Sequence, residues 1–177
     1  MLYLEISNQE YNQIINIDSD SLIEDIKMRV HYFVENLGMR PPWNRIRIHF
    51  ITPEQMKKRD SNAEGLCYSH YDGYFDIYIK CGYSYLYTKS ILAHEIGHTW
   101  INDNKIKLTK MENEGFCQLL SYQILYSDFA LSSNNNMLSL REWRDEVYGD
   151  GFRLMKSKLD SLGWPQLLLF LQISFQK

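Results

Sequence analysis

The sequence is poor in cysteine. Its three cysteines, Cys67, Cys81 and Cys117, are an odd number and include no Cys-x-x-Cys spacing. Small secreted domains that depend on disulfides carry more cysteines than this, so we expect free and mostly buried thiols in a reducing compartment. A pairing of Cys67 with Cys81 across a hairpin stays open, because only coordinates decide it.

Long apolar runs and a strong excess of one charge are also missing. No apolar run approaches the roughly 18 residues of a membrane span, and no basic segment followed by an apolar one stands at the N-terminus. The formal net charge is −3 and the pI is about 5.9. The sequence therefore predicts a cytoplasmic location, with no membrane partner and no nucleic-acid partner.

No internal repeat, low-complexity tract or long linker divides the 177 residues, so we expect a single domain over residues 1–177. Alternating apolar residues predict strands at 2–6 and 46–51. Asp72-Gly73 between two aromatic-rich runs predicts a hairpin that pairs 66–71 with 74–79.

Apolar residues at helical spacing predict the remaining elements. The expected helices cover about 22–37, 83–102, 111–126, 138–162 and 165–175. We expect a capping box at Ser21 and Glu24 for the first helix and an interruption at 149–151 in the fourth. A second capping box, from Thr52 to Gln55, predicts one short helix. The predicted class is α+β: a small antiparallel sheet of three or four strands packed on a helix bundle.

The most informative stretch is Ala93-His94-Glu95-Ile96-Gly97-His98-Thr99-Trp100, which contains His-Glu-x-x-His. Positions i and i+4 of a helix share one face, so His94 and His98 can direct both imidazoles at one ion. Glu95 lies about 100° round the helix, where its carboxylate reaches a water on that ion. These residue types predict a hydrolytic Zn²⁺ site with Glu95 as general base. Gly97 predicts the close approach of another backbone or of a ligand.

A catalytic zinc site needs a third protein ligand and an open position for water. The stretch Glu112-Asn113-Glu114-Gly115 offers two carboxylates, and we favour Glu114, since Gly115 leaves room for close approach to the helix with the histidines. Glu112 lies on nearly the opposite helix face. Gln118, one turn after Glu114, can orient a ligand histidine.

These motifs resemble the gluzincin class of zinc peptidases, in which the third ligand is a glutamate. More narrowly, His94 to Trp100, Glu112 to Gln118 and Tyr148-Gly149-Asp150-Gly151-Phe152-Arg153 resemble the peptidase domain of the plant organ-size regulators. Those are ubiquitin-activated peptidases with LIM modules, and this chain has no LIM-type cysteines. Asn113 stands where that family usually has a second acid.

The resemblance implies a peptidase, with Glu95 taking the proton of the attacking water and later passing it to the leaving amine. A donor must stabilise the tetrahedral oxyanion. Tyr148 is the candidate by its place in the third block, with Tyr122 and Arg153 as rivals and a packing role as the alternative.

The expected partner is a peptide or protein substrate. If strand 74–80 lies at the sheet edge above the motif helix, its free backbone groups can pair with an extended peptide; the alternative is an internal strand. Three other functions remain open. They are a zinc-stabilised binding module without turnover, a zinc hydrolase acting on a non-peptide amide, and a subunit that is inert without its partner.

Overall fold

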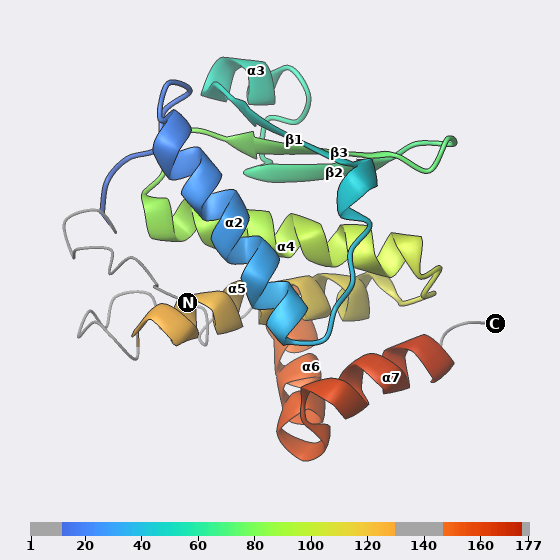
Figure 1. Ribbon diagram of the computed structural model, residues 1–177. Helices are drawn as coiled ribbons and strands as arrows, with labels where there is room; N and C mark the ends of the chain where they lie inside the picture. Colours follow the sequence, from blue (N-terminus) through green and yellow to red (C-terminus); the bar gives the residue numbers. More distant parts are fainter. Residues whose placement is uncertain (1–11, 130–146, 175–177) are drawn as a thin grey trace.

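The computed structural model describes residues 12–129 and 147–174, and its elements confirm the α+β class. The predicted strand at 2–6 lies outside the described residues. Figure 1 shows a layered arrangement in which the sheet covers helix α4 (Tyr85–Asp103), and α5 (Lys110–Phe129) lies on the other side of α4. The helix that carries the histidines is therefore the central layer.

Helix α2 (Asp20–Asn36) packs against α4 through the apolar stripe expected from the sequence. It begins earlier than predicted, so the capping box at Ser21 is wrong. Ser19 precedes the helix, and its hydroxyl accepts a hydrogen bond from the backbone N–H of Asn16 instead of capping the helix. The helix ends just before Gly38, which has a φ of +90°.

The sheet within the described residues has three strands, β1 (Ile46–Ile51), β2 (Gly65–Ser69) and β3 (Phe75–Lys80), in the order β1-β3-β2. The hairpin of β2 and β3 is antiparallel as predicted. However, β1 pairs with β3 in parallel, so the expectation of a purely antiparallel sheet is wrong.

Of the two alternatives left open for strand 74–80, the edge position is wrong and the internal position is confirmed. Both edges of β3 are paired, one with β1 and one with β2. The physical reason lies in its side chains: Phe75, Ile77 and Ile79 are all buried, and a strand covered in this way gains most when it lies at the centre of the sheet. Strands β1 and β2 form the two edges of the sheet.

Helix α3 (Pro53–Lys57) connects β1 to the hairpin and starts with the predicted capping box. The Thr52 hydroxyl accepts from the backbone N–H of Gln55, and the Gln55 side chain accepts from the backbone N–H of Thr52. Local sequence signals therefore placed this short element correctly.

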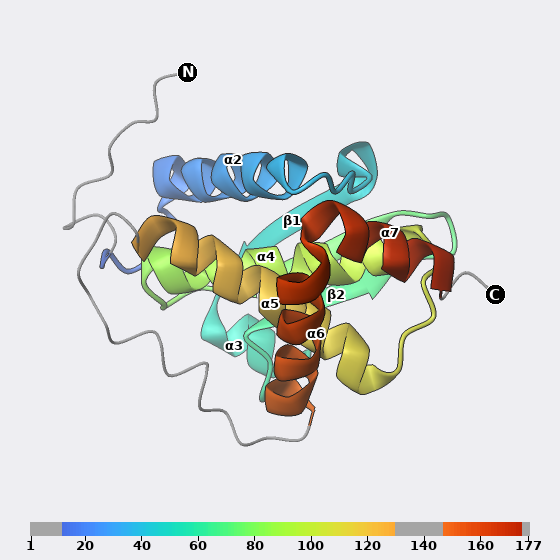
Figure 2. The same cartoon turned by 90° about the horizontal axis from the view of Figure 1, so that it is seen from below.

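Helix α6 (Tyr148–Leu162) crosses α5 steeply, as Figure 2 shows, and α7 (Trp164–Ser174) follows it. The predicted interruption at 149–151 is wrong, because these residues form the first turn of α6. The two glycines Gly115 and Gly151 meet where the helices cross. A Cβ on Gly115 would lie 2.2 Å from the carbonyl carbon of Gly151, and a Cβ on Gly151 would lie 2.2 Å from the carbonyl oxygen of Met111.

Gly115 thus makes room for α6 and not, as predicted, for the helix with the histidines. In the described parts of the chain, no helix is both long enough and apolar enough to cross a membrane.

The crossing of α5 and α6 yields a stability prediction. Replacing Gly151 with alanine should destabilise the protein by about 1–3 kcal/mol, although alanine by itself favours a helix, because the new methyl group meets backbone that cannot rotate away. Urea unfolding measures the effect, with Ser157→Ala on the exposed side of α6 as control. Equal stability of the two variants would contradict the close approach.

Candidate metal site

Helix α4 stacks the two motif histidines one turn apart. Ser84 caps its N-terminus by accepting from the backbone N–H of Tyr87, and the helix then runs without interruption through both histidines. The ring centroids of His94 and His98 lie 4.8 Å apart, and their Nε2 atoms are 3.1 Å apart. One side of α4 therefore presents two imidazole nitrogens to a single point.

Helix α5 brings Glu114 to the same point. Its N-terminus is fixed by a reciprocal cap, in which Glu112 accepts from the backbone N–H and hydroxyl of Thr109, and the Thr109 hydroxyl accepts from the backbone N–H of Glu112. Oε2 of Glu114 lies 3.2 Å from Nε2 of His94 and 3.6 Å from Nε2 of His98. Glu112 is thus engaged as a helix cap, while Glu114 lies beside the histidines.

The three distances are close to those of a tetrahedral metal site. Metal–ligand bonds of about 2.0–2.2 Å place neighbouring ligands about 3.3–3.6 Å apart, and the three ligand atoms here are separated by 3.1, 3.2 and 3.6 Å. Two imidazole nitrogens and one carboxylate oxygen are donors that zinc accepts. The described residues therefore fit a metal ion if the two shorter separations widen slightly.

The close packing of α4 on α5 makes this geometry possible. A Cβ on Gly97 would lie 3.3 Å from the Cα of Cys117 and 2.9 Å from both its Sγ and a methyl group of Leu120. The expectation that another backbone approaches Gly97 is confirmed. Any larger residue between the two histidines would push α5, and Glu114 with it, away from them.

Cys117 is a second candidate for the third ligand that sequence reasoning did not consider. His94, His98 and Cys117 form a cluster that could hold a metal ion, with one ligand atom from each within 4.8 Å of the others. However, Sγ of Cys117 lies 3.4 Å from Nδ1 of His98, on the opposite edge of the ring from the Nε2 atom that faces His94 and Glu114. Burial raises the pKa of the Cys117 thiol, with the charges of Glu114 and Glu95 adding to the effect. We therefore favour Glu114, because its Oε2 atom lies beside the Nε2 atoms of both histidines.

Two side-chain amides lie near the histidines. Gln118, which the sequence suggested for this role, is close enough to His94 to raise the pKa of its imidazole. Asn113, which the sequence did not suggest, has its Oδ1 atom 2.8 Å from Nδ1 of His98. No short-range pattern in the sequence points to this contact, because it depends on how α5 is rotated against α4.

Glu95 lies between α4 and the edge strand β2. Its side chain is 6 % exposed, and a Cβ on Gly65 would lie only 2.5 Å from its Oε1 atom. Burial raises the pKa of Glu95 to about 7, although the charge of His94 acts in the opposite direction. A carboxylate with a pKa near neutrality is suited to accept and return a proton.

The charges of the cluster are coupled. Burial lowers the pKa of His94, but its hydrogen bond to Glu114 and the charges of Glu95 and Glu114 outweigh burial and raise it. Burial and the neighbouring His94 lower the pKa of His98 to about 4. Burial raises the pKa of Glu114, but the hydrogen bond and charges of the histidines outweigh it and lower it. The cluster thus favours an ionised Glu114 beside a neutral His98.

Residues 74–141 match the DA1-like family model, described as Protein DA1. This stretch is less than half of the chain and includes β3, α4 and all of α5, with both motif segments. No curated protein and no solved structure matched the chain. The DA1-like match is consistent with the resemblance drawn from the sequence.

The block from Tyr148 to Arg153, which also carried the resemblance, lies beyond the DA1-like match. Tyr148 is the first residue of α6, and its side chain lies outside the described residues. Of its two rivals as oxyanion donor, Tyr122 is buried against the ring of Phe152, and Arg153 forms an ion pair with Asp150. The oxyanion donor therefore stays a prediction.

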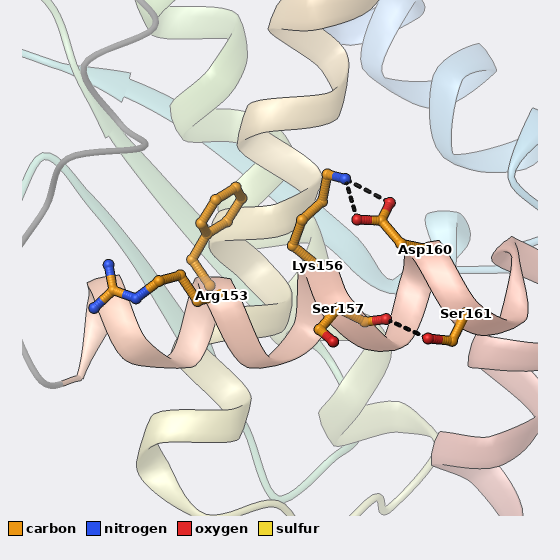
Figure 3. A pocket seen from close by; sticks show the side chains of 6 residues that line it. Arg153, Lys156, Ser157, Asp160 and Ser161 are labelled. Atoms are coloured by element: carbon orange, nitrogen blue, oxygen red, sulfur yellow. Dashed lines mark hydrogen bonds and ion pairs between the residues drawn. The ribbon is translucent and has the colours of Figure 1, made fainter.

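A hollow on the surface of α6 is a separate feature. Figure 3 shows that the residues lining it come from this single helix. Nζ of Lys156 lies 2.7 Å from Oδ2 of Asp160, and the hydroxyl of Ser161 donates to the carbonyl of Ser157. Its polar groups are thus engaged with one another, and we assign it no chemistry.

The site yields a prediction that separates the candidate third ligands. Glu114→Ala should lower zinc affinity by a factor of about 100 or more, because it removes a donor. Cys117→Ala and Glu112→Ala should retain affinity close to that of the unmodified protein. Competition with a chelating dye measures all three.

The control for folding is the helix content of each variant by circular dichroism. A larger loss of affinity in Cys117→Ala than in Glu114→Ala would make the thiol the third ligand. A larger loss of zinc affinity in Glu112→Ala than in Glu114→Ala would make Glu112 the third ligand.

Proposed function

We propose that the protein is a zinc-dependent peptidase. In this proposal His94, His98 and Glu114 hold Zn²⁺, and Glu95 is the general base. The observation that carries the proposal is the convergence of three suitable donor atoms at 3.1–3.6 Å from one another, with a buried carboxylate next to them. The DA1-like match to the same segment supports it.

The role of Glu95 follows from its place beside the metal ligands. Zinc bound by these residues would lower the pKa of a water molecule and polarise a substrate carbonyl. Glu95 would accept the proton of the attacking water and pass it to the nitrogen of the leaving amine. Its burial against Gly65 keeps the carboxylate in one position and shields it from bulk water.

The edge strand β2 is the best candidate for binding an extended substrate, in place of strand 74–80. Within the described residues β2 pairs with β3 alone, so its other edge has unpaired backbone groups. Gly65 of β2 contacts Glu95, and Cys67 of β2 contacts Thr99 one turn later on α4. A peptide paired with this edge would lie along the helix that carries the general base.

The position of Cys117 bears on one alternative, the zinc-stabilised binding module without turnover. If Cys117 joined the other three ligands, the site would be closed and would stabilise the fold without turnover. Removal of the metal separates the two functions, since a structural site unfolds when it is emptied and a catalytic site mainly loses activity. The position of Cys117 at the far edge of the His98 ring favours the catalytic function. A zinc hydrolase that cleaves a non-peptide amide would use the same residues.

The catalytic proposal predicts how Glu95 behaves when it is replaced. Glu95→Gln keeps the shape of the side chain but removes its basicity, so one zinc ion per chain should remain bound. Cleavage of an unbiased peptide library should fall by a factor of about 10² to 10⁴. Mass spectrometry of the digest and metal analysis of the same sample measure the two quantities.

Glu112→Gln is the matched control, because it replaces a carboxylate on the adjacent helix that we assign to capping. It should cleave at nearly the original rate. Unchanged cleavage by Glu95→Gln would rule out the general-base role.

A further inference from the structure

The outer edge of the His98 ring contacts Asn113, a residue with no role in the catalytic proposal. Nδ1 of His98 lies 2.8 Å from Oδ1 of Asn113. The thiol of Cys117 is nearby, with Sγ 3.4 Å from the same Nδ1 atom and 3.7 Å from Oδ1 of Asn113. Cys117 is buried where α5 packs on α4, and His98 and Asn113 are half-buried there.

The amide oxygen of Asn113 can satisfy two donors. Cys117 lies four residues after Asn113 on α5, and its thiol donates to this oxygen. A carbonyl oxygen has a second lone pair, and Nδ1 of His98, at 2.8 Å, is placed to donate a proton to it. With the proton on Nδ1, the lone pair of the ring is on Nε2, which is the atom that faces His94 and Glu114.

The reverse arrangement would disable the site. If the proton were on Nε2, this nitrogen would have no lone pair to offer to a metal ion, because a neutral imidazole has only one acceptor nitrogen. The ring of His98 can rotate little, since Asn113 and Cys117 lie against its outer edge. Metal binding therefore requires the tautomer with the proton on Nδ1. The acceptor at Nδ1, which is Oδ1 of Asn113, favours this tautomer.

We propose that Asn113 is a positioning residue that holds His98 as the Nδ1–H tautomer and so directs its Nε2 lone pair at the metal position. This inference rests on the proposed function for its importance, although the tautomer itself does not depend on catalysis. Asn113 thus gives His98 a neutral amide partner. Ligand histidines are commonly oriented by carboxylates or backbone carbonyls.

The neutral partner has a consequence that a purely structural role would not have. A carboxylate at Nδ1 makes the imidazole a stronger donor than an amide does. Asn113→Asp retains the acceptor and adds charge, so it should bind zinc at least as tightly as the unmodified protein. Asn113→Ala removes the acceptor and should bind zinc about 10- to 100-fold more weakly.

The experiment has two readouts. Long-range ¹H–¹⁵N spectra of the metal-free protein, with ¹⁵N-labelled histidine, report the tautomer of His98. Titration of Zn²⁺ against a competing chelator reports affinity. Asn102→Ala is the matched control, because Asn102 is an exposed amide one turn beyond His98 on α4.

We expect the Nδ1–H signature of His98 in the unmodified protein, in Asn113→Asp and in Asn102→Ala, and its loss together with weaker zinc binding in Asn113→Ala. Asn113→Leu, which keeps the branched shape of asparagine but has no acceptor, repeats the test if the alanine variant does not fold. Retention of the Nδ1–H signature and of zinc affinity in the alanine and leucine variants would overturn the inference. Failure of the unmodified protein to bind zinc would instead overturn the proposed function, while the spectra would still decide the tautomer.

Discussion

The arrangement of the site depends on how closely α5 approaches α4. The two histidines occupy one side of α4 by helical geometry alone, but Glu114 comes from another helix and reaches them only if the two backbones nearly touch. Gly97 permits this contact, because no side chain separates α4 from Cys117 and Leu120. The distances of 3.2 and 3.6 Å from Glu114 to the histidines follow from that packing.

The same packing imposes a cost. It buries several ionisable groups together, among them Glu95, which is enclosed between α4 and β2. Burial of charge is unfavourable unless it is compensated. The pKa of Glu95 is raised because burial disfavours its charged form. The cluster lowers this free-energy cost by pairing Glu114 with the histidines and by giving the outer edge of His98 an amide partner. A divalent cation would compensate it further, since it adds positive charge among carboxylates.

Local signals in the sequence predicted the helices of the site well, because the spacing of apolar residues acts over a few residues. His94, Glu95 and His98 could be placed from the motif alone. The position of Glu114 beside them required only that α5 pack on α4. The strand order could not be predicted in this way: β3 pairs with β1 across a connection that includes α3 and β2, and short-range patterns do not encode such long-range pairing.

The partners of individual side chains were also beyond sequence reasoning. Gly115 was expected to face α4, but it faces α6, because the choice between two neighbouring helices depends on where α6 crosses. Asn113 was noted only as a departure from a family pattern, since its contact with His98 depends on the rotation of α5. For the same reason Cys117 was counted as an ordinary buried thiol, although it lies at the ring of a predicted ligand.

The central claim is that two imidazoles and one carboxylate, and no thiolate, converge on one metal ion. X-ray absorption spectroscopy of the zinc-loaded protein at the zinc edge tests it most directly. The account predicts nitrogen and oxygen neighbours at about 2.0–2.2 Å, with the multiple-scattering pattern of two imidazoles. A sulfur neighbour at about 2.3 Å would contradict it.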